Sequence, residues 1–190
     1  MSASSSIKHT VTPNGDGNIA AFRDSQSMFY TLRVCIHTTG RQPNGMSDNH
    51  VSVFLLLGEN EGSVRLNMTT EEGDRSGVLV WSQEVYQLSN SQITHFDYRL
   101  RYTMQVGALY AWIRSWGLQR YVFSGGGSGC RFWVYTLLLK LKEIQYLDDG
   151  LPEDAWHKLS WQYSREAAPR VIEIKQGTWL SLKEWEDEWE

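Results

Sequence analysis

Residues 50–69, HVSVFLLLGENEGSVRLNMT, decide the fold. The first part, residues 50–57, becomes a continuous apolar run, which is typical of a strand buried in the middle of a sheet. The second part, residues 63–69, also has the composition of a strand, and a polar turn flanked by Gly58 and Gly62 joins the two. The pattern predicts an antiparallel hairpin whose first strand is central.

Further strand-like stretches lie on both sides of this hairpin. Residues 28–38 combine β-branched and aromatic residues and predict a first strand. Residues 39–49 hold glycine, proline and an Asn-Gly pair, which predict a loop. Beyond the hairpin, residues 78–88 and 96–104 predict two more strands. Short polar loops between these strands favour a curved antiparallel sheet of about five or six strands.

Two amphipathic helices are predicted after the strands. Apolar residues recur at helical spacing over residues 105–116, and Gly117 is suited to end that helix. A second helix is predicted from Cys130 to about Leu147, with one apolar face formed by Cys130, Trp133, Val134, Leu137, Leu138, Leu141 and Ile144. We therefore expect an α+β fold in which two main helices pack on the sheet.

The ends of the chain differ from its middle in composition. Residues 1–27 are rich in Ser, Thr, Asn and Gly and predict a flexible arm, so residues 28–182 are expected to form a single α+β domain. The tail, residues 183–190, is acidic, and a helix there would place Trp185 and Trp189 on one face. The N-terminus lacks the apolar stretch of a secretory signal, so a cytoplasmic location is expected.

Composition restricts the classes of function. The net charge is −4 and no dense stripe of Lys and Arg occurs, which argues against a nucleic-acid partner. The longest apolar runs, residues 51–57 and 132–139, are far shorter than the ~20 residues that cross a bilayer. Nine Trp and nine Tyr residues suit core filling, and they also favour a pocket for an apolar or aromatic small molecule. No cofactor is implied, and the oligomeric state stays open.

Cys130 is the candidate centre for covalent chemistry. It follows the glycine-rich loop 124–129 and opens a helix, where unpaired N–H groups and the helix dipole favour a thiolate. A thiolate nucleophile needs a base, and His50 opens the central strand where it can face the helix start. Asn67, on the next strand of the hairpin, is the candidate group that orients the imidazole. The competing interpretation is that Cys130 only packs in the core, as buried thiols usually do.

The loop before this helix is a second candidate site. Gly127 and Gly129 allow the backbone to approach an anion closely, and Arg131 adds positive charge. Together with Trp133 these residues are the candidate contacts for a substrate or an anion. The loop lacks the Gly-Lys-Ser/Thr ending of a phosphate-binding loop, so a nucleotide enzyme is not indicated.

A metal site is the third and least supported arrangement. Two thiols and two imidazoles make a complete zinc set, and Cys35, His37, His50 and Cys130 supply these types. No short Cys-x-x-Cys or His-x-x-x-His unit occurs, so the preferred interpretation includes no metal ligand.

The order of these elements resembles a known family. The chain has a His-bearing strand at Asn49-His50-Val-Ser-Val-Phe-Leu, followed by a hairpin, further strands and a helix. It then has Tyr121-Val-Phe and a Cys-bearing helix start at Gly129-Cys130-Arg-Phe-Trp-Val. This layout is similar to the circularly permuted branch of the NlpC/P60 papain-like fold. Lecithin retinol acyltransferase-like proteins belong to that branch. The resemblance spans roughly residues 30–147. That family usually shows Asn-Cys-Glu-His-Phe at the helix start, and a second strand-borne His where this hairpin offers Arg65 or Asn67.

The resemblance implies a cysteine enzyme with Cys130 as nucleophile and His50 as base. We expect acyl transfer or hydrolysis on an apolar or aromatic amide, ester or thioester. The sequence also looks like small uncharacterised fungal proteins, some of them associated with specialised metabolism. A non-covalent cyclase or isomerase of such a pathway, with His50 and Arg131 as acid, base or anion partners, is the alternative. A non-catalytic binding protein is a further one.

Overall fold

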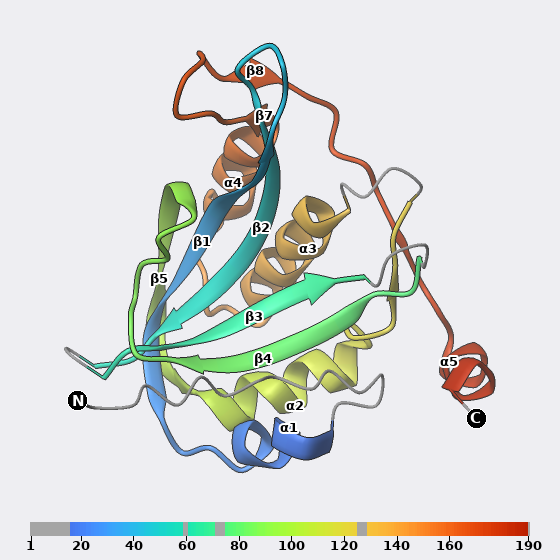
Figure 1. The fold of residues 1–190 in the computed structure, drawn as a ribbon. Coiled ribbons are helices and arrows are strands. Elements are labelled where there is room, and N and C mark those ends of the chain that lie inside the picture. The colour runs from blue at the N-terminus through green and yellow to red at the C-terminus, as the bar shows by residue number, and fades with distance from the viewer. Residues whose placement is uncertain (1–15, 59–60, 71–74, 125–128, 190) are drawn as a thin grey trace, which may run out of the picture.

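The computed structural model describes residues 16–58, 61–70, 75–124 and 129–189, with side chains for residues 19–185 within these ranges. Five antiparallel strands form the main sheet in the spatial order β4-β3-β2-β1-β5 (Figure 1). The strands are β1 (Met28–Arg41), β2 (Ser47–Leu56), β3 (Ser63–Thr69), β4 (Val78–Glu84) and β5 (Gln92–Gln105).

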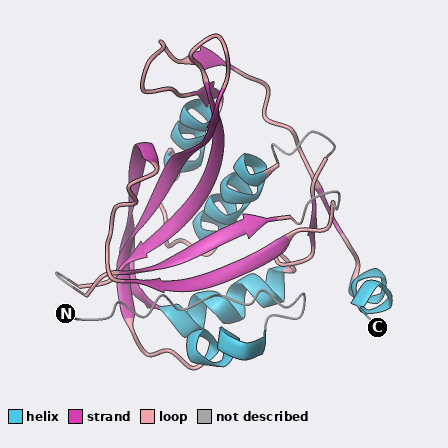
Figure 2. Ribbon diagram, viewed as in Figure 1, coloured by secondary structure: helices cyan, strands magenta, loops and turns pink. Residues whose placement is uncertain are grey.

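Helices and two small sheets complete the described part of the chain. The helices are α1 (Asp16–Arg23), α2 (Val106–Trp116), α3 (Cys130–Glu143), α4 (Leu151–Leu159) and α5 (Leu182–Trp189). The small sheets pair β6 (Tyr121–Val122) with β9 (Thr178–Trp179), and β7 (Trp161–Gln162) with β8 (Arg170–Val171). Helices α2 and α3 pack on the main sheet, α1 lies beside α2, and α4 lies beside α3 (Figure 2). The predicted α+β class is therefore confirmed.

The predicted hairpin is present, and its first strand is the central strand of the sheet. Val53 lies opposite Leu66, and Leu56 lies opposite Ser63. Alternate residues of β2 face the main core beneath α2 and α3, while Phe54 and Leu56 form a small cluster with Cys35. Burial on both faces explains why the second half of this strand, residues 53–56, is continuously apolar.

The same hairpin opens into a fork. Pairing between β2 and β3 ends at Val53 and Leu66, although β2 continues alongside β1 to Ser47 and β3 continues alongside β4 to Thr69. Figure 1 shows the two strands diverging beyond this point, with α3 at the opening. Helix α3 packs against both strands, and Arg131, its second residue, is hydrogen-bonded to Asn49 near the start of β2.

The apolar stripe of α3 is buried as its spacing predicts. Leu137, Leu138 and Leu141 are completely buried in the main core. The helix ends at Glu143 and not near residue 147. Gln145 adopts a left-handed backbone conformation with φ of 62°, which reverses the chain and ends the helix.

Two boundaries differ from the prediction for the first half of the chain. The expected loop over residues 39–49 is only residues 42–46, because β1 continues to Arg41 and β2 begins at Ser47. Gly45, with φ of 78°, makes the tight turn that keeps the strands paired. The pairing register of β1 with β2 shifts between Thr38 and Gly40, which is an irregularity typical of a glycine within a strand.

The expected flexible arm over residues 1–27 is wrong for its second half. Residues 16–23 form α1, and Phe22 is buried with its ring 5.8 Å from that of Trp81. One aromatic side chain anchors this short helix, and such a single anchor does not stand out in a polar segment. Gly107 lets α2 approach closely, because a Cβ there would lie 2.6 Å from the Arg23 carbonyl oxygen. Residues 1–15 lie outside the described residues.

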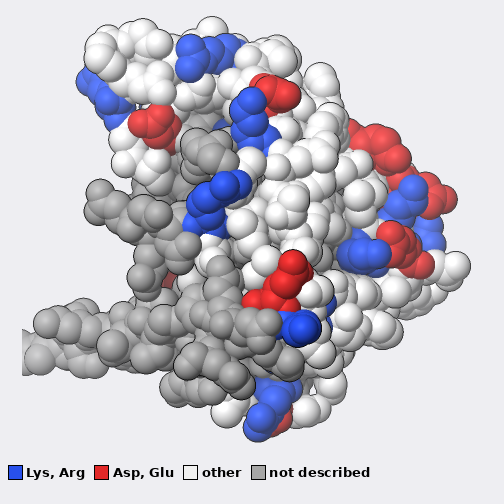
Figure 3. Space-filling view, turned by 90° about the vertical axis from the view of Figure 1, so that its right-hand side faces the viewer, with Lys and Arg blue, Asp and Glu red and all other residues white. Residues whose placement is uncertain are grey.

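The surface carries charges of both signs. On the face drawn in Figure 3, Lys and Arg side chains lie beside Asp and Glu side chains, with uncharged areas between them. Within the described residues, no helix has the length and apolar character needed to cross a membrane.

Candidate active site

Cys130 is the first residue of α3, and hydrogen bonds of Tyr121 fix the chain just before this residue. Tyr121 of β6 donates its hydroxyl proton to the Gly129 carbonyl oxygen at 2.8 Å. The Gly177 N–H donates to the same hydroxyl at 3.0 Å. A Cβ at Gly129 would lie 2.7 Å from the Tyr121 hydroxyl oxygen and 2.9 Å from the Phe123 ring. Glycine is therefore required for the chain to pass this close before it enters the helix.

His50 lies between the other two residues predicted for catalysis, Cys130 and Asn67. It lies on β2 and Asn67 lies on β3, on the two sides of the fork. The His50 Nε2 atom is hydrogen-bonded to the Asn67 side-chain oxygen. The same imidazole lies close enough to the Cys130 side chain for each group to shift the pKa of the other. Because Asn67 occupies Nε2, the nitrogen that remains for the sulfur is Nδ1.

The electrostatics of this pair favour charge separation. Burial alone raises the pKa of Cys130, but the hydrogen bond and charge of His50, the Arg131 charge and the Val51 N–H together hold that pKa below its ordinary value. Burial likewise lowers the pKa of His50, yet the contacts with Cys130 and Asn67 outweigh it and raise the pKa. Both directions favour transfer of the thiol proton to the imidazole.

A second imidazole lies next to this pair, on β1. His37 is the register partner of His50, and the two ring centroids are 6.3 Å apart. Arg65 donates to the Ser52 hydroxyl at 3.2 Å, and the same hydroxyl is hydrogen-bonded to His37 Nε2 at 2.7 Å. His37 Nδ1 is hydrogen-bonded to the Ser91 hydroxyl at 3.0 Å. Burial, with help from Arg65 and His50, lowers the pKa of His37 to about 3, so this imidazole is neutral at pH 7.

Arg131 does not face a ligand, contrary to its predicted role in anion binding. The residue is 2% exposed. Its guanidinium donates to the carbonyl oxygens of Leu159 and Trp161 at 2.8 and 3.0 Å, and to the Asn49 side-chain oxygen at 3.1 Å. These bonds tie α3 to the end of α4 and to β2. A buried Arg side chain must satisfy its donors, and here the protein's own acceptors do so.

The other predicted substrate contacts have different positions. Trp133 is completely buried and donates its indole N–H to the Leu118 carbonyl oxygen at 2.8 Å, so it is a core residue and not a surface contact. Gly129 lies at the helix start, as predicted, but it packs on Tyr121. Gly127 lies outside the described residues. The apolar stripe of α3 could have identified Trp133 as a core residue, because it lies at the same helical spacing as the buried leucines.

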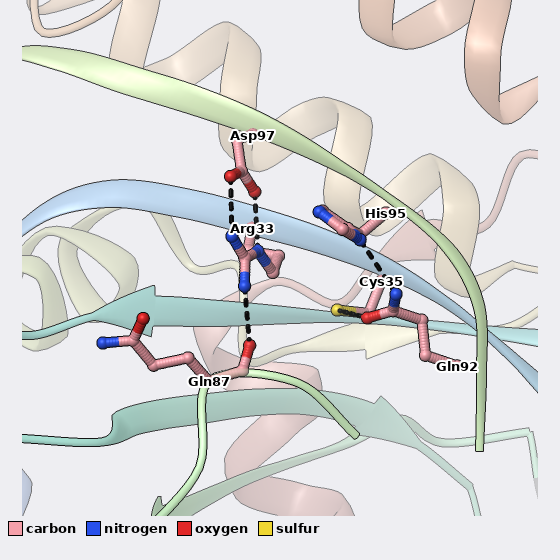
Figure 4. A network of polar contacts seen from close by, with 6 residues as sticks. All are labelled: Arg33, Cys35, Gln87, Gln92, His95 and Asp97. Atoms are coloured by element: carbon pink, nitrogen blue, oxygen red, sulfur yellow. Dashed lines mark hydrogen bonds and ion pairs between the residues drawn. The ribbon is translucent and has the colours of Figure 1, made fainter. Parts of the chain in front are cut away.

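Cys35 is in a different environment from Cys130. It is completely buried, and burial raises its pKa to about 12. Figure 4 shows its thiol directed at the Gln92 side chain, at 3.5 Å, with Gln92 in turn bonded to His95 and the Arg33–Asp97 ion pair nearby. Such a thiol is inert.

The alternative zinc set is not assembled. Among the described residues, no group of three or more His, Cys, Asp or Glu side chains is placed to hold a metal ion. Cys35 and His37 are bonded to Gln92, Ser52 and Ser91 instead.

Aromatic side chains also line a separate cavity of about 380 Å³ between α3 and α4. Its lining is formed by Phe132, Tyr135, Glu153, Trp156 and Gln176, so none of the three predicted catalytic residues belongs to it. The high aromatic content predicts a pocket of this kind, but the sequence alone did not indicate which aromatic residues form it.

Comparison with known proteins gives one result. No curated protein and no solved structure matches the chain. Residues 32–180 match the model of a domain of unknown function, DUF7770, and this span contains Cys130, His50 and Asn67. Since the match covers most of the sequence, the chain belongs to the DUF7770 family.

Proposed function

We propose that the protein is a cysteine-dependent acyltransferase or hydrolase for an amide, ester or thioester of an apolar or aromatic small molecule. The observation that carries the proposal is the position of the His50 ring, which is hydrogen-bonded to Asn67 and lies near Cys130, with which it interacts electrostatically. This arrangement supports the assignment of Cys130 as nucleophile, His50 as base and Asn67 as orienting group, the order that thiol catalysis requires.

The reaction follows from this geometry. His50 Nδ1 takes the proton of Cys130, and the sulfur attacks the carbonyl carbon of the substrate. The leaving amine, alcohol or thiol receives the proton from His50, and the acyl group remains on Cys130 as a thioester. Water, or an acceptor hydroxyl or amine, then attacks the thioester while His50 takes its proton. The thiol is restored with an acid or a new acyl compound as product.

The start of α3 supports both charged species in this sequence. The first N–H groups of a helix have no partner within the helix, and they carry partial positive charge. Next to Cys130 they stabilise the thiolate before attack and the oxyanion after it. Asn67 accepts from His50 Nε2 and holds Nδ1 toward the sulfur, so we assign it a positioning role.

The arrangement of elements supports a permuted papain-like layout. The His-bearing strand precedes the Cys-bearing helix in the chain, and the hairpin partner of that strand supplies the orienting residue. Asn67 then occupies the role that a second His has in lecithin retinol acyltransferase-like proteins. This layout, like the chemistry, is part of the proposal.

One observation favours the non-covalent alternative. Cys130 is only 2% exposed, so its sulfur is not open to a substrate in this conformation. A cyclase or isomerase would need His50 as an acid or base but no attack by sulfur. The two candidates therefore differ in whether an acyl group ever resides on Cys130.

Trapping of the acyl-enzyme separates these candidates. The protein is incubated with p-nitrophenyl esters of acyl chains of increasing length, and with phenylacetyl and benzoyl esters, and the intact mass and the released nitrophenol are measured. We expect a burst of nitrophenol and an added acyl mass that peptide mapping assigns to Cys130. Cys35→Ser is the matched control and should behave like the wild type, whereas Cys130→Ser should lose the burst. Folded protein that acquires no acyl mass with any ester would contradict the proposal.

A further inference from the structure

The cavity between α3 and α4 has an unusual lining. Phe132 and Tyr135 are three residues apart on α3, and Glu153 and Trp156 are three residues apart on α4. Residues at this spacing share a helix face, so each helix directs one pair into the space between them. Gln176, from the extended segment after β8, completes the lining. The cavity of about 380 Å³ is within the range of small-molecule sites.

Two of the three aromatic rings that line the cavity meet at a steep angle. The rings of Tyr135 and Trp156 meet nearly edge to face, with centroids 4.7 Å apart and planes at 63°. The Phe132 ring packs against the Trp179 ring, and the two ring centroids are 5.7 Å apart. Each of the three lining rings is only partly buried. Their π-faces are electron-rich, and such faces attract cations.

The charge of the residues that line the cavity also favours a cationic ligand. The five lining residues comprise three aromatic rings, one amide and the Glu153 carboxylate, so the only formal charge among them is negative. Lys142 is the basic residue that pairs with Glu153. Its Nζ atom lies 4.0 Å from the Glu153 carboxylate and 3.9 Å from the Asp149 carboxylate. Lys142 is thus shared between two acids at long distances and holds Glu153 weakly.

Among the described residues that line the cavity, few side chains are strong hydrogen-bond acceptors, which narrows the class of ligand further. A primary ammonium or a guanidinium needs three or more acceptors when it leaves water, and Glu153 and Gln176 are the lining side chains that supply strong ones. A quaternary ammonium group has no N–H to satisfy, and its methyl groups fit against aromatic faces. We propose that this cavity binds the quaternary ammonium group of a small organic cation.

Choline and 3,3-dimethylbutan-1-ol provide the direct test, because they have nearly the same shape and differ in charge. Binding to the full-length protein is measured by titration calorimetry at constant ionic strength. We expect choline to bind at least about tenfold more tightly than the neutral alcohol, a difference equivalent to about 1.4 kcal/mol. Equal affinity for the two, or no binding of choline up to high millimolar concentration, would overturn the proposal.

Variants locate the binding to this cavity. Glu153→Gln changes an exposed side chain and should weaken choline binding severalfold without affecting the fold, while Glu143→Gln, on α3 outside the cavity, is its control. Trp156→Leu should weaken binding about tenfold or more, and Trp112→Leu, on the exposed face of α2, is the matched control. Lys142→Met frees the Glu153 carboxylate and should strengthen binding. Choline affinity that is unchanged in both Glu153→Gln and Trp156→Leu would show that the cation binds elsewhere.

This inference is independent of the reaction proposed at Cys130. The cavity lining contains none of Cys130, His50 and Asn67, so Cys130→Ser should bind choline with wild-type affinity. Failure of choline binding leaves acylation of Cys130 open to its own test, and the converse also holds.

Discussion

Replacing His50 with alanine should raise the pKa of Cys130 and slow its alkylation. In the wild type, His50 opposes the effect of burial and keeps the Cys130 pKa below its ordinary value. In His50→Ala, burial is left as the dominant influence, so the pKa should rise above that of a free thiol, which is about 8.5. At pH 7 a thiol with a pKa of 8.5 is only about 3% thiolate.

The size of the effect follows from these populations. If the wild-type pair is largely thiolate and imidazolium at pH 7, His50→Ala should reduce the thiolate fraction by about 30-fold or more. Because the thiolate is the reacting species, the rate of alkylation should fall by a similar factor. The effect should shrink toward pH 9, where a free thiol also ionises.

The assay is the rate of iodoacetamide addition, measured by intact mass and peptide mapping between pH 5 and pH 9. Cys35 is an internal reference, because its buried thiol, with a pKa of about 12, should stay unmodified in the folded protein. His95→Ala is the matched control, since His95 lies on β5 and is bonded to Gln92. Equal rates in wild type and His50→Ala would refute the ion-pair reasoning. A Cys130 that resists prolonged alkylation in the folded wild type would show that its sulfur stays as buried as it is in this conformation, and would favour the non-covalent alternative.

Further predictions concern the neighbours of this pair and the core. Asn67→Ala should lower kcat/KM about 10–100-fold, as expected for loss of a hydrogen bond to a charged group, and should shift the alkylation profile of Cys130 to higher pH. Leu138→Ala, at a completely buried position, should cost about 2–5 kcal/mol in urea unfolding, and an unchanged midpoint would contradict its burial. The pKa of His37 is about 3 in the folded protein, against an ordinary value of about 6.5. Between about pH 3 and pH 6.5 the His37 side chain is therefore protonated in the unfolded chain but neutral in the folded protein. Its contribution to stability is therefore complete above pH ~6.5 and is lost as the pH falls toward 3, by up to ~1.4 kcal/mol per pH unit, and urea unfolding of His37→Gln should show a shallower pH dependence. Phe22→Ala should lower stability by about 3 kcal/mol, whereas deletion of residues 2–15 should leave the unfolding midpoint nearly unchanged; a midpoint unaffected by Phe22→Ala would show that α1 does not anchor the domain.

Local sequence patterns were sufficient for the hairpin and for α3. Residues 53–57 form a continuous apolar run because this part of the chain is covered on both faces, and the run is visible without tertiary information. The stripe through Leu137 and Leu141 has helical spacing because one side of α3 faces the core. The choice of Cys130, His50 and Asn67 rested on position in these elements, namely a helix start and two adjacent strands. In the structure His50 is hydrogen-bonded to Asn67 and lies near Cys130, and their catalytic roles stay a prediction.

Only the tertiary structure decided how the side chains around this site are used. The fork between β2 and β3 depends on the partner that each strand follows, β1 or β4, and no local pattern specifies where two strands separate. Arg131 follows Cys130 directly in the chain, yet its guanidinium is bound by Asn49 and by carbonyl groups beyond α4. Its role was misjudged because those acceptors are distant in sequence.

Distance in sequence also explains the remaining differences. Phe22 is one aromatic residue in a polar segment, and its burial depends on contact with Trp81 of β4. The aromatic cavity requires α3 and α4 to pack so that Tyr135 and Trp156 meet. Strands and helices follow from periodicity because each residue's neighbours within an element are set by backbone geometry. Contacts between elements depend on long-range packing, and for this chain that packing determined which polar and aromatic side chains surround each site.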